Sequence, residues 1–579
     1  MRSRKIADMT RPIHASPDSA AARARRALER AGDRAFGADA NPLRQLGALA
    51  VLALWIAIGS GCIVYVFFDT SAAGAHESLA RLAREQPWFG GLARSIHRYS
   101  ADAFMLLAVA HVAREWIHRR YAGFRWFSWI TGVPLLWLML IAGLVGYWLV
   151  ADTRAQFVAT AIGEWAGAVP GVGDAMLRNF ITDEAISDRL FSLLVFMHLG
   201  IGLLVLLGLW VHVQRLVRPF TQPARRLALG FGATLALLAA AVPALSTAPA
   251  DLSRMPLPVP IDWFFLAPLV LVEWTSPAVV WLLAVAATVL LVVLPWTVRQ
   301  ARPAPAEVDL AQCNGCGRCF DDCPYGAVVL APRSDGRRHA QQAVVAADLC
   351  ASCGICVGAC PSSNPFRSVE PLATGIDLPE LPVAALRTKL RDALAARPGA
   401  TVVFGCDEGA ALERVDAPGV VKLSLACAAQ LPPSFVDYAL RHGAARVLVA
   451  SCGEHACAYR FGARWIEQRL AGAREPALRA HLREPRLRLI EADRGEEDRV
   501  RAALAARGEL SGAQSIKHRG DGAEALQSSV SPVVREQPSK AAEFTTENTE
   551  GTEKNRNRNF VSSVLNAPAG PARVRHSEP

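Results

Sequence analysis

Four histidines at matched spacing in two apolar segments constrain the fold of this chain more than any other feature. His97 and His111 lie in one hydrophobic stretch, and His198 and His212 lie in another, so the members of each pair are fourteen residues apart. Fourteen residues make almost four helical turns, which places both members on the same side, about 21 Å apart along the axis. A single histidine in an apolar helix is usually a satisfied polar residue. Polar side chains without a function are costly inside a membrane. Four histidines at this spacing therefore predict two stacked haem sites in a membrane.

The composition agrees with a chain that is partly membrane and partly cytoplasmic. Of its 579 residues, 52% are hydrophobic and 20% are charged, and the formal net charge is +10. Eight of the 13 cysteines fall in two tight clusters, which indicates metal binding and not a disulfide framework. Such clusters belong on the reducing side of a membrane. The Arg-rich first 40 residues lack the early apolar core of a signal peptide. They are typical of a cytoplasmic flank, with a mitochondrial transit peptide as the alternative.

Six stretches have the length and hydrophobicity of membrane spans. Lys and Arg gather before the first span, after the second, after the fourth and after the sixth, which predicts that both termini are cytoplasmic. The two histidine-bearing spans then run in the same direction, so His97 pairs with His198 on the outer side and His111 with His212 on the inner side. We place the spans at 45–68, 97–117, 130–150, 190–213, 227–246 and 277–298.

The organisation predicted for the chain is a helical membrane domain followed by two small soluble domains. The second soluble domain alternates β-like runs at Ala400–Phe404, Arg446–Ala450 and Leu487–Ile490 with helical stretches, which favours an α/β fold. The tail is polar and without periodicity, which is typical of disorder. The expected segments are a basic N-terminus (1–43), a membrane domain (44–298), a linker (299–306), a cysteine-rich domain (307–369), an α/β domain (381–507) and a disordered tail (508–579).

The membrane domain resembles cytochrome b of the quinol-oxidising bc-type complexes, over about residues 40–298. In that family, glycines on the first and third spans make room for the haem faces, because a missing side chain lets a flat macrocycle approach the backbone. Arginines near the histidines lie close to the haem propionates, as guanidinium–carboxylate pairing favours. The resemblance implies two b-type haems, a homodimer, and these roles for Gly47, Gly61, Gly132, Gly146, Arg94 and Arg114.

A second part of the resemblance concerns quinol oxidation. The segment Pro260–Leu266 is similar to the Pro-Glu-Trp-Tyr motif that lines the outer quinol pocket of the family, and it follows the fifth span. Asp262 would accept the quinol proton, since desolvation raises the pKa of a carboxyl at an apolar boundary. The segment departs from the motif by one inserted residue and by Phe264 in place of Tyr. An interfacial Trp/Phe anchor is the alternative.

The cysteine-rich domain carries the C-x2-C-x2-C-x3-C-P pattern twice and resembles bacterial two-cluster ferredoxins. In this pattern the fourth cysteine of each run binds the other cluster. A zinc site explains a single CxxC pair but not the duplicated run. The pattern therefore predicts two [4Fe–4S] clusters, one held by Cys313, Cys316, Cys319 and Cys360, and the other by Cys350, Cys353, Cys356 and Cys323.

The α/β domain contains four further cysteines and resembles the delta subunit of methyl-viologen-reducing hydrogenases around residues 451–462. That family binds a [2Fe–2S] cluster and passes electrons to heterodisulfide-reductase-type flavoproteins. The first motif has one cysteine here where the family has two. The alternative is a redox-silent docking module with buried thiols. His455 is a fallback ligand, and Cys62 is expected to be a small apolar residue. The implied [2Fe–2S] ligands are Cys406, Cys427, Cys452 and Cys457.

These motifs together predict a multidomain electron-transfer oxidoreductase, a subunit of a larger complex in the bacterial inner membrane. It would exchange electrons between quinone and a cytoplasmic flavoprotein, a heterodisulfide-reductase-like protein or a dehydrogenase or hydrogenase subunit. No GxGxxG stands where a strand and helix would need it, so a separate subunit would carry any flavin or NAD. We expect no nucleic-acid partner. The alternative is a redox-sensing or scaffold protein without quinone turnover, and a transporter is disfavoured because the spans lack a buried charged relay.

Overall fold

The computed structural model describes residues 19–169, 188–251, 265–297, 303–482 and 486–506. Three expected features lie outside these residues. They are the basic stretch up to residue 18, the quinol-site residue Asp262 and the tail from 508 to 579.

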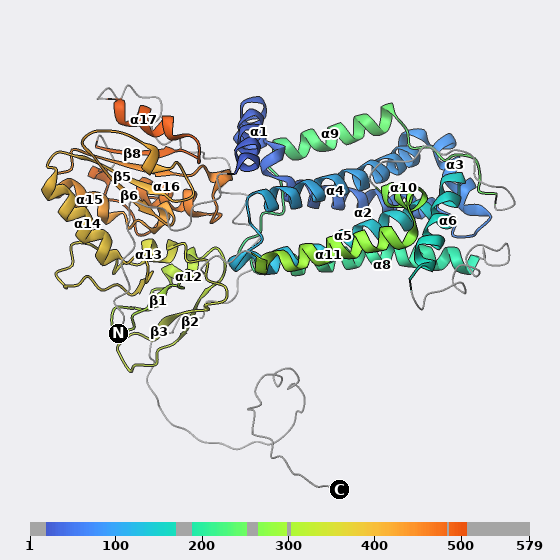
Figure 1. Cartoon of the computed structure of the whole chain (residues 1–579). Coiled ribbons are helices and arrows are strands. Elements are labelled where there is room, and N and C mark those ends of the chain that lie inside the picture. Colours follow the sequence, from blue (N-terminus) through green and yellow to red (C-terminus); the bar gives the residue numbers. More distant parts are fainter. Residues whose placement is uncertain (1–18, 170–187, 252–264, 298–302, 483–485, 507–579) are drawn as a thin grey trace, which may run out of the picture. The chain divides into compact units, whose positions relative to one another are not determined.

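The first half of the described chain is helical, and its long helices lie side by side (Figure 1). Helix α2 packs along α4, and α5 packs along α8, so the two histidine-bearing helices each have an apolar neighbour. The helices are α1 (Ala20–Phe36), α2 (Leu46–Phe67), α3 (Gly74–Glu85), α4 (Leu92–Ile117), α5 (Trp126–Trp148), α6 (Thr153–Gly167), α8 (Asp188–Val213), α9 (Arg225–Ala241), α10 (Ala267–Trp274) and α11 (Pro277–Thr297).

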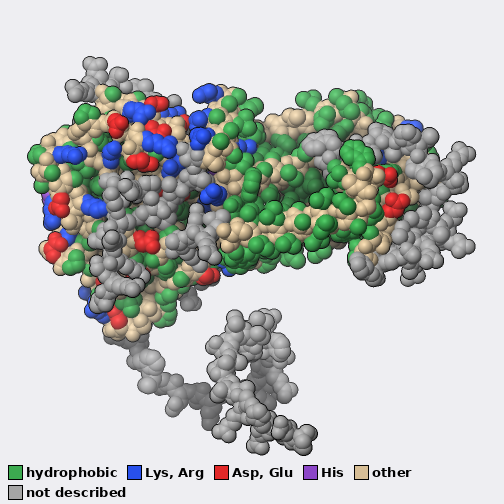
Figure 2. All heavy atoms as spheres, in the orientation of Figure 1, with side chains coloured by type: hydrophobic (Ala, Val, Ile, Leu, Met, Phe, Trp, Pro, Cys, Tyr) green, Lys and Arg blue, Asp and Glu red, His purple; other side chains and the backbone are tan. Residues whose placement is uncertain are grey.

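Four of the described helical segments are long and apolar enough to cross a membrane, and they cover 46–67, 123–148, 191–213 and 277–297. Their outward surfaces carry large apolar side chains, as the continuous hydrophobic area over the helices in Figure 2 shows. Phe196 is 73% exposed and Leu282 is 68% exposed. Such a surface is unfavourable in water and suits the hydrocarbon of a bilayer.

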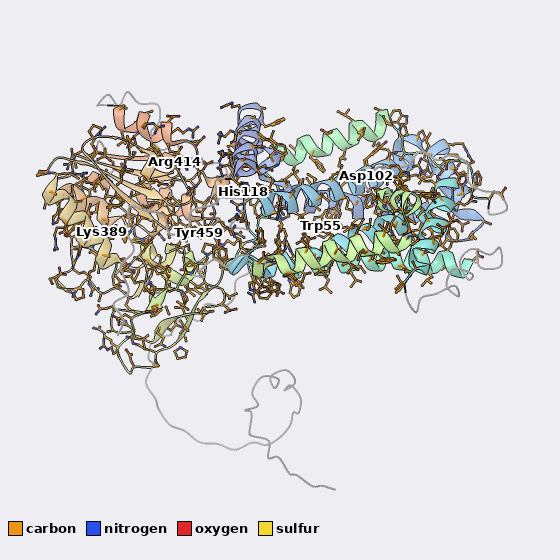
Figure 3. All side chains as sticks on the ribbon, in the orientation of Figure 1. Trp55, Asp102, His118, Lys389, Arg414 and Tyr459 are labelled. Atoms are coloured by element: carbon orange, nitrogen blue, oxygen red, sulfur yellow. The ribbon has the colours of Figure 1, made fainter. Side chains whose placement is uncertain are left out.

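The other two expected spans, 97–117 and 227–246, coincide with α4 and, up to Ala241, with α9, neither of which is both long and apolar enough, so six spans stay a prediction. Helix α4 carries charged residues, among them Arg98 and Asp102, which form an ion pair at 3.1 Å (Asp102 is labelled in Figure 3). Helix α9 has only 17 residues. At a rise of 1.5 Å per residue the helix is about 25 Å long, which is slightly less than the thickness of the hydrocarbon core of a bilayer.

The N-terminal flank contains helix α1, which the sequence did not predict. Ser19 caps it by accepting a hydrogen bond from the Ala22 N–H. Glu29 of α1 is buried and pairs with the guanidinium of Arg114 on α4 at 3.0 Å. Because removing one partner of a buried ion pair strands a charge, this pair holds α1 at the end of α4.

The cysteine-rich domain consists of two short antiparallel β-ladders and two one-turn helices. Each helix follows a glycine with positive φ inside a cysteine run, Gly317 at +78° and Gly354 at +74°, and this left-handed turn lets the chain wrap one site with successive cysteines. Strand β4 pairs with β1, so the chain beyond residue 369 returns to this domain. The elements are β1 (Glu307–Val308), α12 (Arg318–Asp322), β2 (Val328–Pro332), β3 (Gln341–Val345), α13 (Ile355–Ala359) and β4 (Ile376–Asp377).

The next domain has the expected α/β architecture, built on a parallel four-stranded sheet in the order β6-β5-β7-β8. The three β-like runs of the sequence are strands β5, β7 and β8. Strand β6 was missed, although it is largely buried. Its elements are α14 (Val383–Ala396), β5 (Thr401–Cys406), β6 (Val420–Leu425), α15 (Ser434–Arg441), β7 (Arg446–Ser451), α16 (Gly462–Ala471), β8 (Leu487–Glu491) and α17 (Glu497–Ala505).

The two soluble domains share one hydrophobic core. Cys353, Ile355 and Cys356 of the cysteine-rich domain belong to the same buried cluster as Phe404, Cys427 and Ile466 of the α/β domain. Packing of this kind fixes the cysteine loops of the two domains against each other.

A partly buried carboxyl on strand β4 gives a pH-dependent prediction. Asp377 accepts hydrogen bonds from the N–H groups of Leu378 and Val383, yet burial raises its pKa from 3.8 to about 7. The folded state therefore binds this proton more tightly than the unfolded state. The free energy of unfolding should fall as the pH rises through this interval, and Asp377→Asn should abolish that contribution.

Thermal melting of the wild type and of Asp377→Asn between about pH 5.5 and about pH 8 tests this expectation. The melting temperature of the wild type should fall relative to that of the variant as the pH rises. Asp392→Asn, at an exposed position of α14, is the control. Parallel pH curves for all three proteins would contradict the account.

Candidate functional site

The outer histidine pair lies across the gap between two packed helix pairs. The rings of His97 on α4 and His198 on α8 face each other with centroids 6.1 Å apart. The Nδ1 atom of His97 lies 2.8 Å from the carbonyl oxygen of Ala57, and that of His198 lies 3.0 Å from the carbonyl oxygen of Ala142. Each Nδ1–H can thus donate to a backbone carbonyl, which leaves Nε2 free as a metal ligand.

At this separation His97 and His198 would hold one iron atom between them. Imidazole–metal bonds of about 2 Å, and about 1 Å from each nitrogen to its ring centre, give ring centroids about 6 Å apart. The carbonyl partners come from α2 and α5, the neighbours of the two histidine helices, so the packing of four helices fixes both ring orientations.

The four glycines expected beside the haems each lie against one histidine ring. A Cβ built on Gly61 would lie 2.9 Å from Cε1 of His97, and one on Gly146 would lie 3.1 Å from Cε1 of His198. The equivalent distances are 3.4 Å from Gly47 to His111 and 3.4 Å from Gly132 to His212. The glycines therefore make room for the imidazoles themselves in this structure.

The inner pair has a different set of partners. His212 on α8 lies within electrostatic range of His111 on α4. The hydroxyl of Thr131 is 3.2 Å from Nδ1 of His212, and the hydroxyl of Ser128 donates to the His212 carbonyl at 3.3 Å. A hydroxyl accepting from Nδ1–H would again direct Nε2 toward a metal.

Substitution of Gly61 tests the fit at the outer pair. Gly61→Leu places a branched side chain where the ring of His97 stands, so we expect loss of the outer haem with retention of the inner one. Gly59→Ala is the matched control on α2, because a Cβ at Gly59 meets nothing within 4 Å. The haem content of the purified proteins, measured as pyridine haemochrome, decides between them. A full haem complement in Gly61→Leu would contradict the packing argument.

The two arginines expected near haem propionates are both buried but already have protein partners. Arg94 donates to the hydroxyl of Ser246 at 2.8 Å. Arg114 pairs with Glu29 and with Glu115, each at 3.0 Å. The propionate role of both arginines stays a prediction.

The first cysteine quartet consists of the thiols predicted to hold one cubane. Burial raises the pKa of the Cys319 thiol to about 12. A thiol that resists ionisation in this way becomes a thiolate when it binds a metal. The thiols whose proximity adds to the effect are Cys360, Cys316 and Cys313.

The second cysteine quartet is more deeply buried than the first. Burial raises the pKa of Cys356 well above its ordinary value, and Cys353 behaves in the same way. The neighbours that contribute to these shifts include Cys350 and Cys323. Cys350 and Cys323 therefore lie close enough to Cys353 and Cys356 to affect their ionisation, and the exchange of the fourth cysteines stays a prediction.

The third cysteine quartet gathers at the carboxyl ends of adjacent parallel strands. Cys406 ends β5, Cys427 follows β6 and Cys452 follows β7, and the Sγ atoms of Cys406 and Cys452 are 4.0 Å apart. Hydrogen bonds from Cys427 and Cys452 hold the pKa of Cys406 well below its ordinary value. Cys457 completes the group beside Cys452, so four thiols are available for a [2Fe–2S] centre.

The remaining candidates lie apart from these groups. The ring of His455 is hydrogen-bonded to the carboxylate of Asp39 at 2.8 Å. Cys62 is exposed on α2, where a lipid-facing residue is expected. The backbone carbonyls of Ala57 and Ala142, which orient two histidines, were missed because no side-chain pattern in the sequence marks them.

Sequence comparison divides the chain into three matched segments in the predicted order. Residues 37–218 match the cytochrome b/b6/petB family, residues 312–364 match the 4Fe–4S dicluster domain, and residues 404–508 match the delta subunit of methyl-viologen-reducing hydrogenase.

Individual relatives include cytochromes b6 and b, each of which matches about a quarter of this chain. Cytochrome b6 of Synechococcus sp. (strain JA-3-3Ab) is 30% identical over 26% of this chain and 72% of its own length. Cytochrome b of Solanum tuberosum is 31% identical over 28% of this chain. This chain spans only 43% of the length of that cytochrome b. A solved chain titled "Hyperthermophilic respiratory Complex III" aligns at 20% identity with a TM-score of 0.35, over 43% of this chain and 74% of that one.

Proposed function

Because this chain belongs to the cytochrome b/b6 family and continues into a 4Fe–4S dicluster domain and a hydrogenase-delta-like domain, we propose that it is a quinone-linked electron-transfer subunit. It would pass electrons between the quinone pool and a cytoplasmic redox protein, in the inner membrane of a bacterium. The observation that carries the proposal is the opposed pair His97 and His198, with a ring separation that fits one iron atom.

The residues of this chain supply binding, orientation and order to the cofactors. His97 and His198 would bind the outer haem, His111 and His212 the inner haem, and the three cysteine quartets two [4Fe–4S] clusters and one [2Fe–2S] cluster. When bound, these groups each accept and release one electron at a time. The Nδ1 partners of His97, His198 and His212 would hold these imidazoles in one tautomer, so that little reorganisation accompanies a change of iron charge.

Quinol oxidation would take place beside Asp262. Oxidation of quinol to quinone releases two protons and two electrons. The carboxylate of Asp262 would accept one proton, the second would pass to the outer aqueous phase, and the electrons would leave one at a time toward the site of His97 and His198. The soluble partner would be a flavoprotein, a heterodisulfide-reductase-like protein or a dehydrogenase or hydrogenase subunit, since the described residues include no nucleotide-binding glycine loop. The third segment supports this partner class, because it matches a hydrogenase subunit.

Anaerobic stopped-flow mixing with a short-chain quinol tests the proposal. We expect rapid growth of the haem α-band in the wild type and much slower growth in Asp262→Asn. Glu273→Gln, at an exposed position of α10, is the control and should behave as the wild type. Haems that bind stoichiometrically yet ignore quinol would overturn the quinone assignment and would favour the redox-sensing or scaffold alternative.

A further inference from the structure

Arg469 of helix α16 is the largest fully buried side chain described, and its guanidinium joins three separate chain segments. Its side chain is 0% exposed. Nη1 donates to the carbonyl of Ala429 at 2.7 Å, and Nη2 donates to the carbonyl of Ile355 at 3.2 Å and to the carboxylate of Asp322. A buried cation with this many partners is fixed in position.

Each of the three segments lies within two residues of a proposed cluster ligand. Asp322 directly precedes Cys323, and Ile355 lies between Cys353 and Cys356, so both adjoin the second cysteine quartet. Ala429 is two residues beyond Cys427 of the third quartet. One side chain therefore connects the ligand loops of two centres in two domains.

Asp322 is held from the opposite side as well. It is 3% exposed, and its carboxylate accepts a hydrogen bond from Nε of Arg474 at 2.8 Å. The indole N–H of Trp465 donates to the carbonyl of Asp322 at 3.3 Å, and the Arg474 guanidinium lies 3.6 Å from the centre of the Trp465 ring. The α/β domain thus contacts Asp322, the residue next to Cys323, through both the side chain and the backbone of Asp322.

The loop that contains Gly354 and Gly358 and the loop that contains Ala429 and Gln430 approach each other so closely that no additional side chain fits between them. A Cβ on Gly358 would collide with the Ala429 carbonyl, and one on Gly354 would lie 2.6 Å from a side-chain carbon of Gln430. Cys353 lies within electrostatic range of Cys427, and the buried Tyr459 (Figure 3) lies near both thiols. The second and third quartets are therefore neighbours.

We propose that Arg469 and Asp322 form a positioning pair that clamps the second cysteine quartet against the third, so that the second [4Fe–4S] site exchanges electrons directly with the hydrogenase-delta-like centre. This inference rests on the proposed function for its cofactors. In each exchange one electron leaves one centre, which is oxidised, and enters the other, which is reduced. No covalent bond forms or breaks, and Arg469 stays protonated throughout.

The test is electron paramagnetic resonance of the fully reduced full-length protein. Two paramagnetic centres in adjoining loops broaden each other's signals and speed their relaxation. The wild type should show this coupling, and Cys427→Ser, which lacks a ligand of the third quartet, should show the second cubane without it. A wild-type cubane signal identical to that of Cys427→Ser, in a wild type that contains both centres, would overturn the proposal.

Arg469→Gln examines the clamp itself. With iron content retained, it should lose the coupling, and Asp322→Asn should lose it to a similar extent. Arg469→Lys keeps the positive charge but lacks the planar guanidinium that donates to several partners at once. This variant should retain part of the coupling. Arg464→Gln is the matched control on α16, because Arg464 is 44% exposed and pairs only with Glu454 among the ion pairs described. Unchanged coupling in fully loaded Arg469→Gln and Asp322→Asn would contradict the positioning role.

Failure to assemble the cofactors remains informative. If Arg469→Gln loses iron, Arg469→Lys tests the positioning role instead. Full coupling in Arg469→Lys would show that the positive charge alone suffices, which would contradict a role for the guanidinium geometry. The underlying function fails differently. A wild type without a [2Fe–2S] signal in Mössbauer spectra would refute the cofactor assignment of the third quartet, whereas two intact but uncoupled centres would refute the clamp alone.

Discussion

Replacing His198 with Ala should remove one of the two haems and leave the other in place. The ring of His198 is the only described imidazole facing His97, at 6.1 Å between centroids, so its loss leaves one axial position without a protein ligand. We expect the haem content to fall by about half, with loss of one of two steps in a potentiometric titration. His212→Ala should remove the other step.

The control for both variants is His76→Ala. His76 lies on α3 and its Nε2 is 2.9 Å from the carbonyl oxygen of Thr247, away from both pairs. It should retain both haems. Retention of two haems of unchanged potential in His198→Ala would show that the opposed rings do not hold iron.

Cys353→Ser should remove the second [4Fe–4S] cluster. Cys353 is buried in the core shared by the two soluble domains, and its replacement takes one of four thiolates from a site without a spare cysteine nearby. Non-haem iron should fall from about ten to about six atoms per chain. Because a cluster bound here would fill space in the shared core, the soluble half of Cys353→Ser should also unfold at a lower temperature.

Cys62→Ser is the matched control for the cysteine variant. Cys62 is exposed on α2 and belongs to none of the three quartets. Its iron content and melting temperature should equal those of the wild type. An unchanged iron content in Cys353→Ser would contradict the assignment of Cys353 as a ligand of the second cluster.

The sequence predicted those parts of the molecule in which spacing along the chain determines position in space. Fourteen-residue intervals on apolar helices placed four histidines and four glycines in register, and the structure sets Gly61 against His97 and Gly146 against His198. The duplicated cysteine runs predict two sets of cluster ligands in the same way, and these sets stay a prediction. In both cases a local repeat sets the geometry, so no long-range information was needed.

Features that depend on long-range packing were not predictable. Strand β6 is buried, but Lys422 and Ser424 interrupt its six residues, so it lacks the continuous apolar run that marked β5 and β7. The carbonyl of Ala57 that orients His97 belongs to an unremarkable apolar helix. Arg469 carries no sequence signal either, because its partners lie 40, 114 and 147 residues away in the chain. The shared core of the soluble domains also depends on contacts between residues that are far apart in the chain, so the sequence did not predict it.

One measurement tests the central claim that haems and clusters form one electron path. The full-length protein is placed in nanodiscs with quinone and mixed anaerobically with a reduced ferredoxin, which is too large to reach the buried haems. The account predicts that the haem α-band rises after the iron–sulfur absorbance bleaches in the wild type, and that it fails to rise in Cys353→Ser. Haem reduction at the wild-type rate in Cys353→Ser would show that the second cluster does not lie between the donor and the haems.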